Sequence, residues 1–303
     1  MKKRIFAALL CVIMLFGMLP VTALAAEPTA HAVTIERTGE VYEDLVEAVK
    51  AAESGDTIQL GEGNYTLYGV PSVGHTKEKD LTFVGQGADK TAWNIGAEVP
   101  NPYYFGTEYN SDYSFDGAGT VTFQDMTLRS GTANYLGFTR PDNTVVENCT
   151  INGKTFYWGY KSATFTNTTF NCPSGDYALW TYSSPTMTFE NCTFNSSGKV
   201  INVYNEGGTP NIVVNFSNCR VNNEGFSLKP VLNINDAPVK SFTINISGNI
   251  SVSGVDPDGI SCSRLFGFGY ARNNQKKQLS TSTARRSGKT AVWLMRSYTT
   301  IAV

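Results

Sequence analysis

The sequence has little charge and almost no histidine, and its charges are unevenly distributed. Charged residues make up 17% of the 303 residues, and the two histidines are His31 and His75. Residues 26–263 contain 13 basic and 26 acidic residues, whereas residues 264–303 contain 8 basic and no acidic ones. The net charge of -2 is therefore a cancellation between segments. Because the main segment is acidic, it lacks the basic surface that phosphate contacts require, so we expect no nucleic-acid partner.

The cysteines lack paired spacing. None of the six occurs in a CxxC motif, and without Cys11 an odd number remains, so the pattern is not a disulfide framework. With histidine so scarce, zinc ligation is also disfavoured, and we expect no metal and no cofactor. Cys149, Cys192 and Cys219 follow polar repeat positions, and we interpret them as small buried residues. A Cys192–Cys219 disulfide is a less favoured alternative.

The sequence also lacks an apolar run long enough to span a membrane. The longest run, residues 5–19, has about 15 residues, short of the ~20 that a spanning helix needs. It follows Lys2, Lys3 and Arg4 and precedes Ala23-Leu24-Ala25, the pattern of a cleaved signal peptide. We therefore expect residues 1–25 to be a signal peptide. The protein would be secreted, or associated with the cell surface, with no membrane-spanning segment.

A short pattern is repeated through the middle of the chain. In each copy, two strand-like segments flank a polar residue, at Asp125, Asn148, Asn167, Asn191 and Asn218. The separations are 23, 19, 24 and 27 residues, which is the length of one coil of a β-solenoid. We expect these residues to form corners, where Asn tolerates left-handed backbone geometry and can hydrogen bond to the next coil.

A further strand-like segment recurs every 22 residues. It is found at residues 134–138, 156–160, 178–182 and 200–204, with later copies expected at 231–235 and 264–268. Side chains alternate between the two faces of a strand, and we place the apolar or small set inward. The other set then forms an exposed aromatic ladder. Its proposed ligand-binding members are Trp158, Tyr160, Trp180, Tyr182 and Tyr204.

The N-terminal part of the chain has a helical pattern. Within residues 42–53, Tyr42, Leu45, Val49 and Ala52 share one face, and Gly55 ends the helix. The first coil of a solenoid exposes an open core and unpaired strand edges. We expect this amphipathic helix to cover both.

Two segments resemble a known family. Residues 45–65 contain Ser-Gly-Asp-Thr-Ile-Gln-Leu and Gly-Asn-Tyr, and residues 81–87 read Leu-Thr-Phe-Val-Gly-Gln-Gly. Together they resemble the opening of proteins of the pectin-lyase-like superfamily, over about residues 40–268. The resemblance implies an all-β fold, a right-handed parallel β-helix (solenoid) with an N-terminal amphipathic capping helix. It implies no single activity, because this fold hosts lyases, hydrolases, esterases, adhesins and proteins without catalysis.

The repeat also defines the expected domains. Residues 26–40 would be a linker and residues 41–268 the parallel β-helix domain. Residues 269–303 have no coil pattern and no acidic residue. We expect this basic tail to be disordered or aberrant, which would leave the last coil uncovered.

The motifs of the family's enzymes are missing. The sequence contains neither the Gly-His-Gly motif of polygalacturonases nor the Asp-Phe-x-Phe-Gly stretch of pectin methylesterases. Glu147 and Glu190 adjoin corner residues, so we interpret them as solvated turn residues and not as the paired carboxylates of a glycosidase. The sequence thus favours a non-enzymatic role, with no catalytic residue assigned.

Three functions remain as hypotheses. The first is binding of a polysaccharide or surface glycan, by a monomer, through the aromatic ladder, because sugar C–H faces stack on aromatic rings. The second is a polysaccharide lyase, with Arg140 or Lys161 as the base near Asp142, Asp176 and Glu206, and Ca²⁺ as cofactor in that case alone. The third is a structural or adhesive surface protein. An alternative role for the ladder rings themselves is to stack on each other for stability or to lie under a loop such as residues 205–212.

Overall fold

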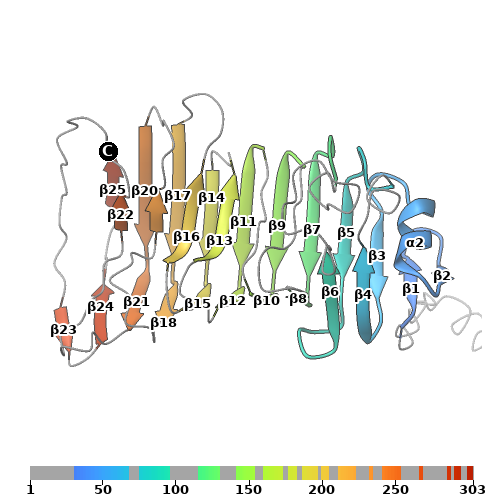
Figure 1. Cartoon of the computed structure of the whole chain (residues 1–303), viewed down its shortest axis with the longest axis horizontal. Coiled ribbons are helices and arrows are strands. Elements are labelled where there is room, and N and C mark those ends of the chain that lie inside the picture. The colour runs from blue at the N-terminus through green and yellow to red at the C-terminus, as the bar shows by residue number, and fades with distance from the viewer. Residues whose placement is uncertain are drawn as a thin grey trace, which may run out of the picture.

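The computed structural model describes fifteen segments of the chain. These are residues 31–67, 75–95, 115–129, 141–153, 160–172, 177–182, 186–196, 199–204, 211–222, 232–234, 241–253, 266–268, 285–287, 290–294 and 299–302. They contain mostly strands, with one helix (Figure 1). No helix in these segments is both long enough and apolar enough to cross a membrane.

Three sheets run along the molecule, and we name them the first, second and third sheet. The first sheet has the order β2 (Glu40–Tyr42), β1 (Val33–Ile35), β3 (Thr57–Leu60), β5 (Leu81–Val84), β7 (Thr120–Gln124), β9 (Asn143–Glu147), β11 (Ser162–Thr166), β14 (Thr186–Glu190), β17 (Asn211–Ser217), β20 (Ser241–Ser247) and β25 (Thr299–Ala302). The second sheet has the order β23 (Arg285–Ser287), β24 (Thr290–Leu294), β21 (Asn249–Ser253), β18 (Arg220–Asn222), β15 (Thr193–Ser196), β12 (Thr169–Cys172), β10 (Thr150–Asn152), β8 (Thr127–Arg129), β6 (Thr91–Ile95) and β4 (Gly63–Leu67). The third sheet has the order β13 (Tyr177–Tyr182), β16 (Lys199–Tyr204), β19 (Leu232–Ile234) and β22 (Phe266–Phe268).

Most neighbouring strands are parallel and lie one repeat apart in the sequence. In the first sheet, Phe165 pairs with Val146 on one side and with Phe189 on the other. In the second sheet, Phe170 pairs with Ile151 and Phe194. This stacking confirms the expected all-β class with long parallel sheets and a solenoid-like arrangement.

The corner between the first and second sheets has the predicted geometry. The backbone φ angles are 54° at Asp125, 53° at Asn148, 50° at Asn167, 53° at Asn191 and 53° at Asn218. Asn and Asp adopt this left-handed region more readily than most residues, which explains their recurrence. The amide ladder is present where Asn167 Nδ2 donates to Asn148 Oδ1 at 3.0 Å.

The next corner uses glycine. Gly248 has φ of 67°, and it is placed after Ser247, which pairs with Ser217. A Cβ atom at this position would collide with Asn218 Oδ1, so glycine is required both by φ and by space. Asn218 Oδ1 accepts a hydrogen bond from the backbone N–H of Asn249 at 3.0 Å, which extends the ladder by one coil.

The interior contains columns of aromatic rings. Phe189 is stacked between Phe165, with ring centroids 5.2 Å apart, and Phe216, with ring centroids 5.3 Å apart. Phe170 and Phe194 form a second stack with a separation of 4.7 Å. The inward positions of a parallel stack lie directly above one another, so like residues meet.

A second buried column follows the corners and confirms the interpretation of the cysteines. Cys149, Cys192 and Cys219 are buried free thiols, and Thr168 occupies the equivalent position in its coil. Cys192 Sγ lies 3.3 Å from Phe165 O, and Thr168 Oγ1 donates to Thr166 O at 3.0 Å. Burial raises the pKa of the Cys149 thiol to about 12. A hydrogen bond with Cys219, together with burial, raises the pKa of Cys192.

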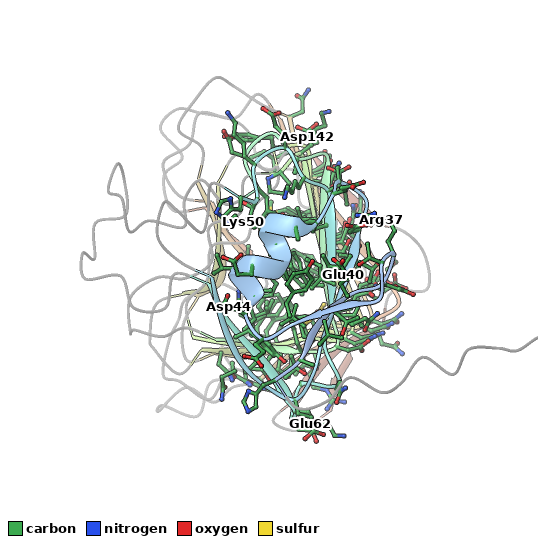
Figure 2. All side chains as sticks on the ribbon, turned by 90° about the vertical axis from the view of Figure 1, so that its right-hand side faces the viewer. Arg37, Glu40, Asp44, Lys50, Glu62 and Asp142 are labelled. Atoms are coloured by element: carbon green, nitrogen blue, oxygen red, sulfur yellow. The ribbon has the colours of Figure 1, made fainter. Side chains whose placement is uncertain are left out.

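The N-terminal end differs from the repeats. Helix α2 (Leu45–Ala51) begins after Asp44, whose side chain accepts a hydrogen bond from Val46 N at 2.6 Å. Leu45, Ala48 and Val49 are buried, and α2 lies beside β1 and β2 at one end of the molecule (Figures 1 and 2). The helix is shorter than the predicted 42–53, because residue 42 belongs to β2.

A buried carboxylate also distinguishes this end. Arg37 Nε donates to Asp56 Oδ1 at 2.6 Å, and Glu53 N donates to Asp56 Oδ2 at 2.8 Å. The Asp56 side chain is 3% exposed, whereas that of Arg37 is 46% exposed. The hydrogen bond from Arg37 lowers the pKa of Asp56, and this effect outweighs the opposite effect of burial.

Three strands lie in the segment that was expected to be disordered or aberrant. β25 pairs antiparallel with β20, and β24 pairs antiparallel with β21. β23 then pairs antiparallel with β24. Backbone pairing of this kind does not require the repeat pattern. The expectation for residues 269–303 as a whole stays a prediction.

Candidate functional site

The third sheet carries the backbone positions of the aromatic ladder. Its register pairs Trp180 with Asn202 and Tyr182 with Tyr204, while Leu179 pairs with Ile201. Ile201 is fully buried, in agreement with the expected inward set. The ladder positions in β13 and β16 therefore lie in adjacent rungs and have the opposite parity to Ile201 along their strands.

Of the five proposed ladder residues, the structure describes the side chain of Tyr160. Tyr160 is exposed, with 43% of its surface accessible, and its backbone N–H donates to Pro141 O at 3.0 Å. Trp158 lies outside the described residues, as do the side chains of Trp180, Tyr182 and Tyr204. The ladder as a whole thus remains a prediction.

The last strand of the third sheet is shifted by one residue. The copy expected at 264–268 would place Leu265 opposite Leu232. In the structure, Phe266 pairs with Leu232 and Phe268 with Ile234. The long insertion before this strand removes the spacing from which register was predicted.

The candidate lyase base is held in an ion pair. Lys161 Nζ lies 2.6 Å from Asp142 Oδ2, with Lys161 70% exposed and Asp142 38% exposed. Arg140, Asp176 and Glu206 lie outside the described residues. A role for Lys161 as a lyase base stays a prediction.

The two corner glutamates lie in one column of the first sheet. Glu147 pairs with Thr166, and Thr166 pairs with Glu190, so the glutamates are two rungs apart. Glu147 Oε2 accepts a hydrogen bond from Gln124 Nε2 at 2.6 Å. Glu190 is exposed, and within the described part of the chain its carboxylate makes no ion pair.

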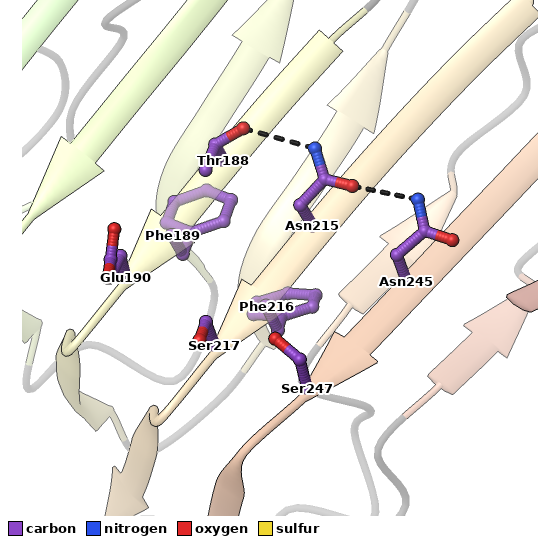
Figure 3. A pocket seen from close by; sticks show the side chains of 8 residues that line it. All are labelled: Thr188, Phe189, Glu190, Asn215, Phe216, Ser217, Asn245 and Ser247. Atoms are coloured by element: carbon purple, nitrogen blue, oxygen red, sulfur yellow. Dashed lines mark hydrogen bonds between the residues drawn. The ribbon is translucent and has the colours of Figure 1, made fainter. Parts of the chain in front are cut away.

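A shallow pocket lies beside Glu190 on the first sheet (Figure 3). Its volume is about 260 Å³. The lining residues come from β14, β17 and β20, and they are Thr188, Phe189, Glu190, Asn215, Phe216, Ser217, Asn245 and Ser247. Asn215 Nδ2 donates to Thr188 Oγ1 at 3.1 Å, and Asn245 Nδ2 donates to Asn215 Oδ1 at 2.8 Å.

No sequence motif pointed to this pocket. The signal was the drop in side-chain size along one column, which runs from Gln124 and Glu147 to Ser217 and Ser247. No group of three or more His, Cys, Asp or Glu side chains that could hold a metal ion occurs in the segments that the structure covers. No protein-family model and no curated protein matches the sequence.

Proposed function

We propose that the chain is a right-handed parallel β-helix of the pectin-lyase-like superfamily, with α2 as its N-terminal cap. The parallel register of the three sheets supports the helix, as do the left-handed corners between the first and second sheets. The apolar face of α2 and its place beside β1 and β2 support the cap.

The proposed function is binding of a polysaccharide or surface glycan by an exported monomer, either secreted or associated with the cell surface. The observation that carries this proposal is the register of β13 and β16, where Tyr182 pairs with Tyr204 and Trp180 occupies the same set of positions. Parallel rungs repeat at ~4.8 Å, so an extended glycan would meet ring after ring along the stack. The exposed Tyr160 supports a continuation toward the N-terminal coils.

A glycan array and titration calorimetry on selected glycans test the proposal. Replacement of Trp158 or Trp180 by Ala should weaken binding by about fivefold each, corresponding to ~1 kcal/mol per ring. Tyr42→Ala is the matched control, because Tyr42 is an aromatic residue of β2, which lies at the N-terminal end of the molecule and away from the third sheet (Figure 1). Unchanged affinity in both Trp variants would overturn the ladder as the binding surface.

A further inference from the structure

The pocket on the first sheet arises from a change of side-chain size within one outward column. Along this column the residues are Gln124, Glu147, Thr166, Glu190, Ser217 and Ser247. The last two are the smallest and lie side by side in β17 and β20. Two neighbouring rungs thus leave space beside the Glu190 carboxylate (Figure 3).

The rim of the pocket opposite Glu190 is a fixed row of polar groups. Asn215 is hydrogen bonded on both sides, to Thr188 and to Asn245, so its amide is held in one orientation. Ser217 and Ser247 lie in the same column as Glu190, on the other side of the pocket from this row (Figure 3). Their hydroxyls can both donate and accept hydrogen bonds. The Ser217 hydroxyl already accepts from Asn218 Nδ2 at 3.4 Å, which leaves its own hydrogen available to a ligand.

The charge of the pocket limits its ligand. None of the residues that line it is cationic, and Glu190 is the single anionic one. An anionic ligand would be repelled, whereas neighbouring hydroxyls of a neutral ligand can each donate to the carboxylate. The volume of about 260 Å³ lies just below the ~300 Å³ at which drug-sized pockets begin, which suits one ring.

We propose that this pocket binds one uncharged sugar ring, with Glu190 accepting hydrogen bonds from two adjacent hydroxyls. The inference rests on the proposed function only for the class of ligand, carbohydrate. The surface is a different one, on the first sheet and not on the third. It would select neutral sugars against uronic acids.

The test uses three methyl glycosides, of glucose, galactose and mannose, each paired with its uronate. Titrations of the ¹⁵N-labelled chain would follow the backbone amides of Ser217, Ser247 and Gly248. At least one neutral glycoside should shift these signals at pH 7, and its uronate should bind at least tenfold more weakly. The proposal is overturned if no neutral glycoside shifts them, or if the uronates bind equally well.

Variants in the same column give matched controls. Glu190→Gln should lower the affinity for the neutral glycoside by about tenfold. It should also reduce the ratio of the affinities for the glycoside and its uronate to less than threefold. Glu147→Gln should change neither. Ser217→Gln fills the pocket with the side chain that occurs at residue 124 and should abolish the shifts, whereas Thr166→Gln, outside the pocket, should preserve them.

Failure here and failure of the aromatic ladder are distinguishable. Trp180→Ala changes the third sheet and should leave the shifts at Ser217 and Ser247 unaltered. If the ladder binds glycans and these shifts are absent, only the pocket is wrong. If the shifts appear and the Trp variants have no effect on the array, only the ladder is wrong.

Discussion

The central coils and the N-terminal end of the molecule are stabilised in different ways. In the centre, each contact recurs one rung away, as in the stack of Phe165, Phe189 and Phe216. At the N-terminal end, single contacts without a repeat fix the structure, such as the hydrogen bonds from Arg37 to Asp56. A change in the centre can therefore be compared with an equivalent position, whereas a change at the end cannot.

The largest effect should come from the middle of the ring stack. Phe189→Ala should lower the free energy of unfolding by about 3–5 kcal/mol, because it leaves a cavity between two rings. Urea unfolding followed by circular dichroism would measure this change. Phe216→Ala is the control, since Phe216 is 4% exposed and Phe189 is fully buried. An equal loss in both variants would contradict the importance of the central position.

Substitutions at a corner should separate two contributions to the free energy of unfolding, that of the backbone conformation and that of the side-chain hydrogen bond. Asn167→Ala should lower the free energy of unfolding by about 2 kcal/mol, because Ala disfavours a φ of 50° and the hydrogen bond to Asn148 is lost. Asn167→Gly retains the geometry and should cost about half as much. The same two substitutions at Asn191 should give the same order in urea unfolding. Equal costs for Ala and Gly at both corners would show that the backbone conformation contributes nothing.

The N-terminal ion pair should give a dependence on pH. The pKa of Asp56 is lowered from 3.8 in the folded state, so its contribution is present above about pH 4 and is lost as the pH falls through the folded value. Arg37→Met should reduce the free energy of unfolding at pH 7 and should reduce it less at pH 3, and the effect should be modest because Arg37 is half exposed. Urea unfolding at the two pH values would measure the difference.

Lys50→Met is the control for this pair. The Lys50–Glu47 pair is exposed at both ends and has an N–O distance of 3.7 Å, so its loss should change stability little at either pH. If Arg37→Met has the same effect at pH 7 and pH 3, the pair does not couple Asp56 to folding.

The smallest effect should come from substituting one column residue type for another in the buried column of Cys149, Thr168, Cys192 and Cys219. Cys192→Thr should change the free energy of unfolding by less than about 1 kcal/mol, because Thr168 makes equivalent contacts one coil away. Cys192→Val lacks the donor and should be the less stable of the two. The Cys149 thiol, buried and with its pKa raised to about 12, should resist alkylation at pH 8 until the chain unfolds.

The corners were predictable from sequence because few residues tolerate a positive φ, and Asn recurs wherever the chain must adopt it. Asp125 and Asn218 were assigned correctly for this reason. Gly248 was not found, because glycine occurs in many contexts and carries no side chain to mark the column. The pairing of Arg37 with Asp56 was also not predictable, since it joins two residues that belong to no repeat.

The site was less predictable than the fold. The register of Tyr182 with Tyr204 followed from the 22-residue spacing, but the exposure of a side chain depends on which segments cover it. The pocket beside Glu190 depends on small residues in two coils, Ser217 and Ser247, whose alignment is visible only after the rungs are paired. The pocket forms because these two side chains are small, and no sequence motif marks such a position.

The side-chain amide dipoles of the asparagine ladders are aligned along the stacking direction. Asn171 donates to Asn152, Asn195 to Asn171, and Asn222 to Asn195, each bond pointing toward the preceding coil. Asn245 and Asn215 donate in the same sense on the first sheet. Aligned dipoles of this kind polarise one another, so amide hydrogens face the N-terminal coils and amide oxygens the C-terminal ones. A duplicated coil could continue these rows in the same orientation, whereas an inverted coil would bring oxygen against oxygen.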